Sequence, residues 1–157
     1  MSKLTIKSLV DPAKGELEMV GRHYQLMYDE LKIEGRRITD AGIEQWIDST
    51  KRVLDRTLFA EVAKLNGEMI GSIHGAIMMS PAHLGGERIA MVHHIYVLTE
   101  HRASGVAKKL AEAWIERMKG KGISAFQLHV TTGNEAGLAF WRSLGFEAEL
   151  TQLSMRS

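Results

Sequence analysis

The sequence predicts a mixed α/β (α+β) domain in which helices cover the faces of one mixed sheet. Segments with apolar residues at three- and four-residue steps are interspersed with β-branched or alternating segments, in the order β-α-α-β-β-β-α-β-α-β. The chain of 157 residues predicts a single domain over residues 1–157. A domain of this size buries about two-thirds of its unfolded surface. The contents of 45% hydrophobic and 25% charged residues are ordinary for a soluble globular protein.

The N-terminal third predicts one strand and two helices. Apolar residues alternate over residues 4–10 as in a strand, and Asp11-Pro12 offers a helix start. A helical period follows over residues 13–34. The apolar positions of that helix are Leu17, Val20, Tyr24, Met27, Tyr28 and Leu31. A second helix is expected over residues 40–54, after a turn at residues 35–37.

The middle of the chain predicts a hairpin and a central strand. Residues 57–64 and 69–79 flank Asn66-Gly67, a dipeptide that strongly favours a two-residue hairpin turn. After a loop, the apolar run over residues 89–97 predicts the next strand.

The C-terminal part predicts two more helices and two more strands. A helix is expected over residues 102–119, a strand over 125–132, a short helix over 134–144 and a last strand over 146–155. The connections between these strands pass through helices, as parallel or returning connections require.

The joint between the central strand and the following helix is the organising feature of the chain. It reads R-A-S-G-V-A from Arg102 to Ala107, and Lys108 and Lys109 follow. Small residues let another molecule approach the backbone, and the first N–H groups of a helix have no partner within it. Because the helix dipole also favours anions there, the joint predicts a phosphate site. A second interpretation stays equally open, in which Gly105 only permits tight packing of helix on sheet.

The net charge, the cysteine content and the lengths of the apolar runs restrict the partners that we expect for the protein. A formal net charge of +1 provides no large positive field, so we expect no nucleic-acid partner. The absence of cysteine excludes a disulfide framework, a thiolate metal site and a cysteine nucleophile, and it is compatible with the cytoplasm, where we expect the protein. The N-terminal residues lack the apolar core of a signal peptide, and no apolar run approaches the roughly 20 residues of a membrane span. We therefore expect no membrane partner.

Two motifs together resemble the GNAT superfamily of acyl-CoA-dependent N-acyltransferases. The first, R-A-S-G-V-A after an I-Y-V strand, is similar to the family's Q/R-x-x-G-x-G/A pyrophosphate loop. The second, N-E-A-G-L-A-F-W-R-S-L-G-F from Asn134, resembles its N-x-x-A-x-x-F-Y-x-x-x-G-F segment. The similarity covers about residues 68–150. Each motif is loose, but the two at the right separation are far more specific than either alone.

The resemblance implies a GNAT-like fold and an N-acetyltransferase that uses acetyl-CoA as co-substrate. It implies that the backbone amides from Ala103 to Lys108, with Arg102 beside them, hold the CoA pyrophosphate. The strand at residues 95–97 would pair with the pantetheine amides, and an N–H there would polarise the thioester carbonyl. The residues assigned to acetyl-CoA are Ile95, Tyr96, Val97, Arg102, Ala103, Ser104, Gly105, Val106, Ala107, Lys108, Asn134 and Trp141. Asn134 serves equally well as a plain helix N-cap.

Two residues depart from the family pattern. Gly137 replaces an alanine, which weakens the helix slightly. Trp141 stands where the family often has a tyrosine that protonates the departing thiolate, and an indole N–H is a poor proton source. Either another group or water protonates the thiolate, or no acid is needed. The candidate substitutes are Tyr24, Tyr28 and Tyr96. Trp141 is expected to pack against the CoA arm or in the core.

The resemblance implies that the free amine attacks the bound thioester directly, so a base must first take a proton from its ammonium form. His93 and His94 precede the pantetheine-binding residues of the strand, and imidazole titrates near neutral pH. Successive strand residues face opposite sides, so one of the two is expected to reach the acceptor, unless a β-bulge changes the parity. We take His93 as the base; its alternative is a hydrogen-bonded structural histidine. The remaining histidines are expected to be structural or exposed: His23, His74, His83, His101 and His129.

The acceptor is expected to be a primary amine of a small molecule, a protein or a peptide, of unknown identity. Tyr24, Tyr28, Asp29 and Glu30 lie where they could receive a cationic amine, although a solvated helix face explains them as well. No metal is expected, because neighbouring histidines diverge and no carboxylate stands at ligand spacing. A homodimer stays open.

Two other functions stay open beside the transferase. Trp141 suggests a catalytically silent acyl-CoA-binding module. A nucleotide-phosphate enzyme could use the same loop, but the chain lacks a Walker lysine loop and acidic metal ligands.

Overall fold

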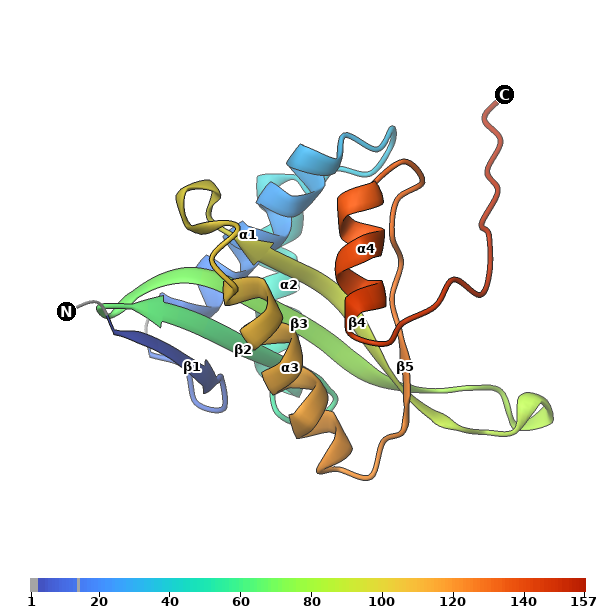
Figure 1. Cartoon of the computed structure of the whole chain (residues 1–157), viewed down its shortest axis with the longest axis horizontal. Coiled ribbons are helices and arrows are strands. Elements are labelled where there is room, and N and C mark those ends of the chain that lie inside the picture. The colour runs from blue at the N-terminus through green and yellow to red at the C-terminus, as the bar shows by residue number, and fades with distance from the viewer. Residues whose placement is uncertain (1–2, 14) are drawn as a thin grey trace.

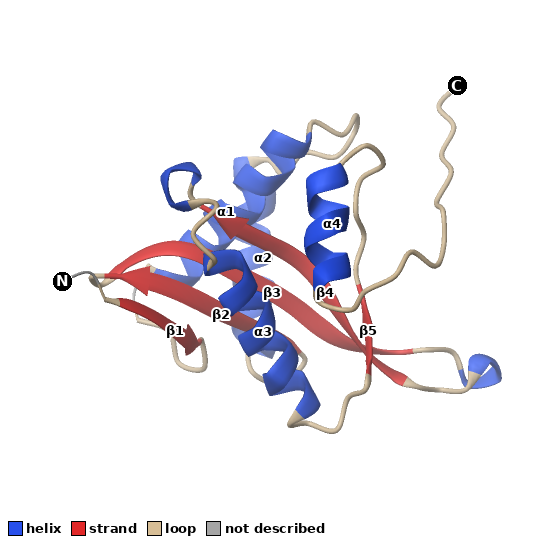
Figure 2. Cartoon of the chain, viewed as in Figure 1, coloured by secondary structure: helices blue, strands red, loops and turns tan. Residues whose placement is uncertain are grey.

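Five strands form one sheet whose spatial order, β1-β2-β3-β4-β5, follows the chain (Figures 1 and 2). The computed structural model describes residues 3–13 and 15–157. The helices and strands are β1 (Leu4–Ser8), α1 (Glu16–Leu31), α2 (Asp40–Val53), β2 (Leu58–Leu65), β3 (Glu68–Met79), β4 (Arg88–Val97), α3 (Val106–Lys119), β5 (Ala125–Gln127) and α4 (Glu135–Ser143). Short 3-10 turns lie at Ala82–Leu84 and Thr99–His101.

The first four strands pair antiparallel, and β5 runs parallel to β4. The connection from β4 to β5 passes through α3, as the return to a parallel strand requires. Asn66 and Gly67 both have positive φ, at 51° and 85°. This is the backbone of a type I′ turn, and it confirms the predicted hairpin between β2 and β3.

Helices cover both faces of the sheet, α3 on one face and α1 with α2 on the other (Figure 1). The larger core lies under α3, where Leu110, Trp114 and Met118 are fully buried against β2, β3 and β4. On the opposite face, Val20 of α1 packs with Ala60 and Val62 of β2. The predicted mixed α/β class and the layered packing are therefore confirmed.

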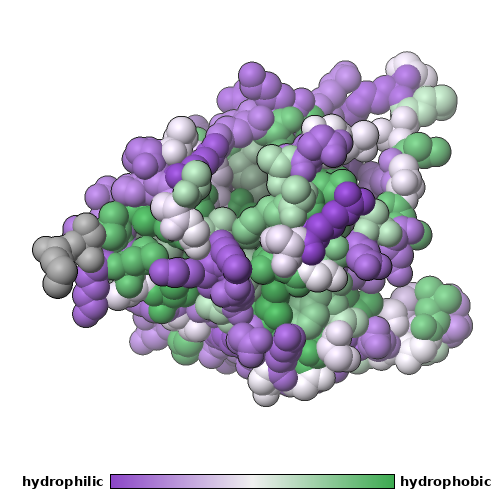
Figure 3. Space-filling model, in the orientation of Figure 1, coloured by the Kyte–Doolittle hydropathy of each residue, from purple (hydrophilic) through white to green (hydrophobic). Residues whose placement is uncertain are grey.

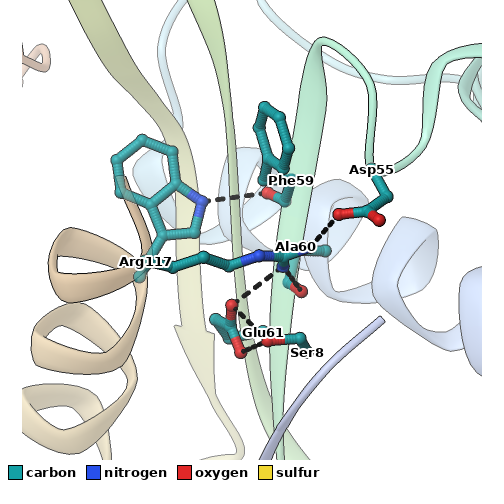
Figure 4. A network of polar contacts seen from close by, with 7 residues as sticks. Ser8, Asp55, Phe59, Ala60, Glu61 and Arg117 are labelled. Atoms are coloured by element: carbon teal, nitrogen blue, oxygen red, sulfur yellow. Dashed lines mark hydrogen bonds and ion pairs between the residues drawn. The ribbon is translucent and has the colours of Figure 1, made fainter. Parts of the chain in front are cut away.

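A polar cross-link ties α3 to β2 on the α3 side of the fold (Figure 4). Arg117 pairs with Glu61 at 2.9 Å and with Asp55. Ser8 of β1 donates its hydroxyl to the same Glu61, whose side chain is only 3% exposed. Next to this network, the Trp114 indole donates to the carbonyl of Phe59 at 2.9 Å.

Three predictions at element ends are corrected. The helix expected from residue 102 begins at Val106, because a 3-10 turn and an open loop precede it. The strand expected over residues 125–132 ends at Gln127, where its pairing with β4 stops. The first helix begins at Glu16, not at residue 13; Lys14 lies outside the described residues.

The strand predicted over residues 146–155 is wrong. This segment forms no strand, and Leu150, Leu153 and Met155 are 88–91% exposed. The tail instead passes α4 towards the α1–α2 loop, where Arg156 donates to the carbonyl of Glu34 at 2.7 Å (Figure 1). Within the described residues, no helix combines the length and the apolar character that a bilayer crossing requires.

Candidate active site

A wedge-shaped opening lies between β4 and the chain that follows β5. The parallel pairing holds only from Ile89–Ala125 to Met91–Gln127, and residues 128–131 then diverge from β4. The resulting cleft is a recess with apolar walls between β4 and α4 (Figure 3). Its lining comprises Met27, Glu30, Leu31, Val92, His93, His94, Ile95, Tyr96, Val97, Arg102, Ala107, Leu128, His129, Val130, Thr131, Asn134, Gly137, Phe140 and Trp141. Because β5 no longer covers it, this edge of β4 is open to an extended ligand.

The loop before α3 has the backbone of an anion site. Ala103 and Gly105 have positive φ, at 61° and 84°. Among the described residues, the N–H groups from Ala103 to Lys108 donate to no backbone carbonyl, and Lys109 is the first whose N–H does, to Gly105 at 3.2 Å. Successive free N–H groups in such a turn, at the positive end of a 14-residue helix, form a concave anion-binding site. A Cβ on Gly105 would meet no atom within 4 Å, so the loop is open on that side.

The side chain of Arg102 is engaged within the protein. Its Nε donates to the carbonyl of Val97 at 2.8 Å, and its Nη2 donates to both carboxylate oxygens of Glu30. The guanidinium also lies over the ring of Tyr96, 5.1 Å from its centroid. Arg102 therefore links β4, α1 and the loop, and it lines the cleft beside the free amides.

A β-bulge places both neighbouring histidines on one face of β4. His74 of β3 pairs with His94 and the next residue, Gly75, pairs with Val92, so His93 is the extra residue. The His74 ring contacts the His94 ring at 4.6 Å and the His93 ring at 5.4 Å between centroids. The expected divergence of the two histidines is therefore wrong, and the bulge is the reason. His93 is exposed in the cleft, whereas His94 is 1% exposed.

Behind His93 lies a buried polar chain. His23 Nδ1 and Ser72 Oγ are hydrogen-bonded at 2.7 Å, and Ser72 Oγ and His94 Nε2 at 3.0 Å. His94 Nδ1 is in turn hydrogen-bonded to His74 Nδ1. All four side chains are at most 1% exposed. The expectation that His23 and His74 are structural or exposed is confirmed, because both are buried and belong to this hydrogen-bonded chain.

Burial keeps these imidazoles neutral. It lowers the pKa of His23 from 6.5 to about 4, and it lowers the pKa of His74 and His94 well below 6.5. Partial burial lowers the pKa of His93 as well, and the charge of His129 adds to this effect. His93 is thus unprotonated at neutral pH, which is the state that a base requires.

Tyr24 and Tyr96 are weak candidates for a proton donor. Burial raises the pKa of Tyr24 to about 12, with Tyr28 adding to the effect. Burial also raises the pKa of Tyr96, and the hydrogen bond to Glu30 raises it further. Tyr24 instead packs with Tyr28, Trp46 and His74, at centroid distances of 4.7–5.6 Å.

The residues of the second motif have structural roles beside the cleft. The Asn134 side chain accepts a hydrogen bond from the Gly137 N–H at 3.0 Å, so the N-cap interpretation is confirmed. Trp141 is 7% exposed and packs between Phe140 and Phe146. Both residues also line the cleft.

The acidic residues of α1 are already paired. Glu30 is bound to Arg102, and Asp29 lies 3.8 Å from Arg37. Glu30, expected as a candidate to receive the amine, lines the cleft but pairs with Arg102. His129 also lines the cleft, although the sequence interpretation gave it no role in the site. The alternation of apolar residues after β5 was the available signal for His129, because it puts this residue on the face opposite Leu128 and Val130.

Comparison with known proteins agrees with this geometry. The chain matches the model of the acetyltransferase (GNAT) family over residues 22–146. It is similar to N-alpha-acetyltransferase 30 of Schizosaccharomyces pombe, at 31% identity over 56% of this chain and 57% of that protein. It is similar to mycothiol acetyltransferase of Saccharomonospora viridis, at 25% identity over 80% of this chain and 39% of that protein. The matches thus span less than two-thirds of these relatives' own lengths.

Solved structures share the fold. Aminoglycoside N-acetyltransferase AAC(6')-Iy in complex with CoA has a TM-score of 0.76 and 19% identity, over 100% of this chain and 96% of that chain. At this identity the likeness concerns the fold alone.

Proposed function

Because the chain belongs to the acetyltransferase (GNAT) family and is an acyltransferase, we propose that it transfers an acetyl group from acetyl-CoA to a primary amine by direct attack. The observation that carries this proposal is the wedge beside β4 together with the free amides that precede α3. One end of the cleft offers donors to a pyrophosphate, and the rest offers an open strand edge and apolar walls to an extended arm.

The residues fit acetyl-CoA as co-substrate. The amides from Ala103 to Lys108 would hold the pyrophosphate, and Gly105 leaves room for it. The backbone of residues 95–97 would hydrogen-bond the pantetheine amides, because β5 leaves this edge free. An N–H of the same edge would stabilise negative charge on the carbonyl oxygen. Asn134 and Trp141 would form the opposite wall.

His93 is proposed as the base. It is the bulge residue of β4, it faces the cleft, and its lowered pKa keeps it ready to accept a proton. It takes one proton from the ammonium form of the acceptor and returns it to solvent. The free amine then attacks the acyl carbon at short range, and proximity supplies much of the rate.

The acceptor is proposed as a primary amine of a small molecule or of a protein or peptide. The similar proteins carry names of unlike acetyltransferases, one an N-alpha-acetyltransferase and the other a mycothiol acetyltransferase. Since Asp29 and Glu30 are already paired, a multiply charged cation has no free carboxylate on this stretch of α1.

The test is thiol release from acetyl-CoA against polyamines, aminoglycosides, amino acids and N-terminal peptides. A thermal-shift titration with acetyl-CoA and with ATP runs beside it. We expect a shift with acetyl-CoA and amine-dependent release. No shift with acetyl-CoA contradicts the proposal, and a preference for ATP favours a nucleotide enzyme. A shift without release from any amine favours the silent binding module, for which buried Trp141 is the supporting observation.

His93→Ala tests the base. Turnover should fall mainly near neutral pH and less at high pH, where the amine loses its own proton. An equal loss at every pH would remove His93 from the mechanism.

A further inference from the structure

Two histidines stand opposite each other at the narrow end of the cleft. The β4–β5 pairing sets Ala90 opposite Phe126 and Met91 opposite Gln127. Extending this register by two residues brings His93 level with His129, beyond the point where the pairing stops. Both residues are exposed and line the cleft. They therefore lie on the two opposite rims, or lips, of the same cleft, His93 on β4 and His129 on the segment after β5.

Both side chains lie on the same face of the sheet. Leu128 and Val130 pack against the core cluster under α3, as Phe126 does. Because side chains of an extended segment alternate, His129 is directed to the other face. That is the face on which His93 contacts His74. A group held between the lips is thus reached by an imidazole from each side.

An acid between the two histidine-bearing segments can protonate the group that leaves during acetyl transfer. When the carbon–sulfur bond breaks, sulfur keeps the electron pair and leaves as a thiolate. Trp141 has no useful acidity, and Tyr24 and Tyr96 hold their protons more tightly than an ordinary tyrosine. An imidazole has an ordinary pKa of about 6.5, so both of its forms are available near neutral pH.

We propose that His129 is the general acid that protonates the departing CoA thiolate, opposite the base His93. The proposal rests on the acetyl transfer proposed above. The N–H bond of the His129 imidazolium breaks as the S–H bond forms, and CoA leaves as the thiol. The second proton of the amine nitrogen passes to solvent as the amide forms, and His129 regains a proton from solvent. The overall reaction releases one proton from the ammonium.

The surroundings separate the roles of the two histidines. One side of the His93 ring lies against the buried neutral ring of His74, next to His94, and this partial burial favours the neutral form of His93. His129 lies at the exposed lip. The charged groups further along the cleft, Glu30 and Arg102, neutralise each other. Titratable groups in unlike environments are how one site supplies both an acid and a base.

The kinetic test compares kcat across pH for His129→Gln, His93→Gln and the control His83→Gln. His83 is exposed in the 3-10 turn between β3 and β4, outside the cleft lining. His129→Gln should lower kcat near neutral pH on the order of 10²-fold, a typical general-acid contribution. It should also abolish the fall of kcat at high pH, whereas His93→Gln should abolish the fall at low pH. A retained high-pH fall with full kcat, or a change in the acceptor KM alone, would overturn the assignment.

A second measurement does not depend on an active acceptor. The ring ¹⁵N resonances of His129, assigned by their loss in His129→Gln, are recorded with CoA and with desulfo-CoA. A thiol close to His129 should shift them towards the imidazolium with CoA only. Equal spectra overturn the inference even if amines are acetylated. A thiol-specific shift supports it even if no tested amine is a substrate, so the two proposals fail separately.

Discussion

Arg102 and Glu30 join the loop before α3 to the last turn of α1. The Nη2 of Arg102 donates to the two carboxylate oxygens of Glu30 at 2.9 and 3.0 Å. Both side chains line the cleft, next to the free amides that we assign to the pyrophosphate. The carboxylate and a bound phosphate therefore compete for one guanidinium.

Separate substitutions of Arg102 and Glu30 should change the affinity for acetyl-CoA in opposite directions. Arg102→Ala should weaken binding about tenfold, because a hydrogen bond to a charged group contributes about 1.5–3 kcal/mol. Glu30→Gln should tighten binding, because it removes the competing anion. The control is Glu18→Gln, on the same helix as Glu30, which removes an exposed ion pair with Lys51 of α2. Calorimetric titration measures all three, and weaker binding by Glu30→Gln would contradict the competition.

Gly105→Glu should abolish acetyl-CoA binding and leave the fold in place. The new carboxylate would stand among the free amides and repel the pyrophosphate. Gly105→Ala is the matched control, because it carries the same backbone strain at φ +84° without a charge. That strain costs about 1–2 kcal/mol for a non-glycine residue. Unchanged affinity of Gly105→Glu in a thermal-shift titration would place the phosphate elsewhere.

Acid should destabilise the protein through its buried histidines. His23 has a folded pKa of about 4 and an ordinary value of 6.5, so the unfolded state binds more protons between these values. Stability is therefore fully present above pH 6.5 and falls as the pH drops towards 4. His23 alone should cost about 3 kcal/mol by pH 4, at 1.36 kcal/mol for each pKa unit.

Urea unfolding at pH 7, 5.5 and 4 measures this loss. His23→Gln should be less stable than the natural chain at pH 7, because it disturbs the bond to Ser72, but it should lose less on acidification. His83→Gln, at an exposed position, is the control. An equal pH dependence in all three proteins would contradict the assignment.

Arg117→Ala should destabilise the fold strongly. It leaves Glu61 as a buried carboxylate without its cation, and breaking a buried pair costs about 3–5 kcal/mol. Lys119→Ala removes an exposed pair from the same helix and should cost less than about 1 kcal/mol. Urea unfolding at pH 7 compares the two, and equal losses would show that the network of Figure 4 adds nothing to stability.

Local patterns predicted most of the fold. The helical period of α1 and α2, the Asn66-Gly67 turn and the apolar run of β4 each follow from neighbouring residues, and the structure confirms them. The strand expected over residues 146–155 failed because alternation shows only that a segment can be a strand. Whether another strand offers it a free edge is a long-range property, and in this structure the tail has none beside it.

The candidate site likewise has parts that follow from neighbouring residues and parts that depend on long-range pairing. The loop from Arg102 to Lys108 is contiguous, so its free amides could be foreseen. The chain of His23, Ser72, His94 and His74 comes from three elements and depends on strand register. The bulge at His93 shifts the alternation of side chains along β4, so that His93 and His94 share one face. His129 comes to lie across the cleft from His93 because β5 stops pairing with β4 two residues earlier. Both are long-range features of the sheet.

The bulge has a consequence for how this protein could lose activity. Ala90, Val92, Ile95 and Val97 all contribute to the core under α3, although an interval of three residues separates Val92 from Ile95. Without His93 these four would follow one another at regular steps of two, and β4 could pair with β3 without interruption. The residue that we assign to proton removal is therefore surplus to the architecture. Deletion of this one residue should leave the scaffold in place and remove the proposed base.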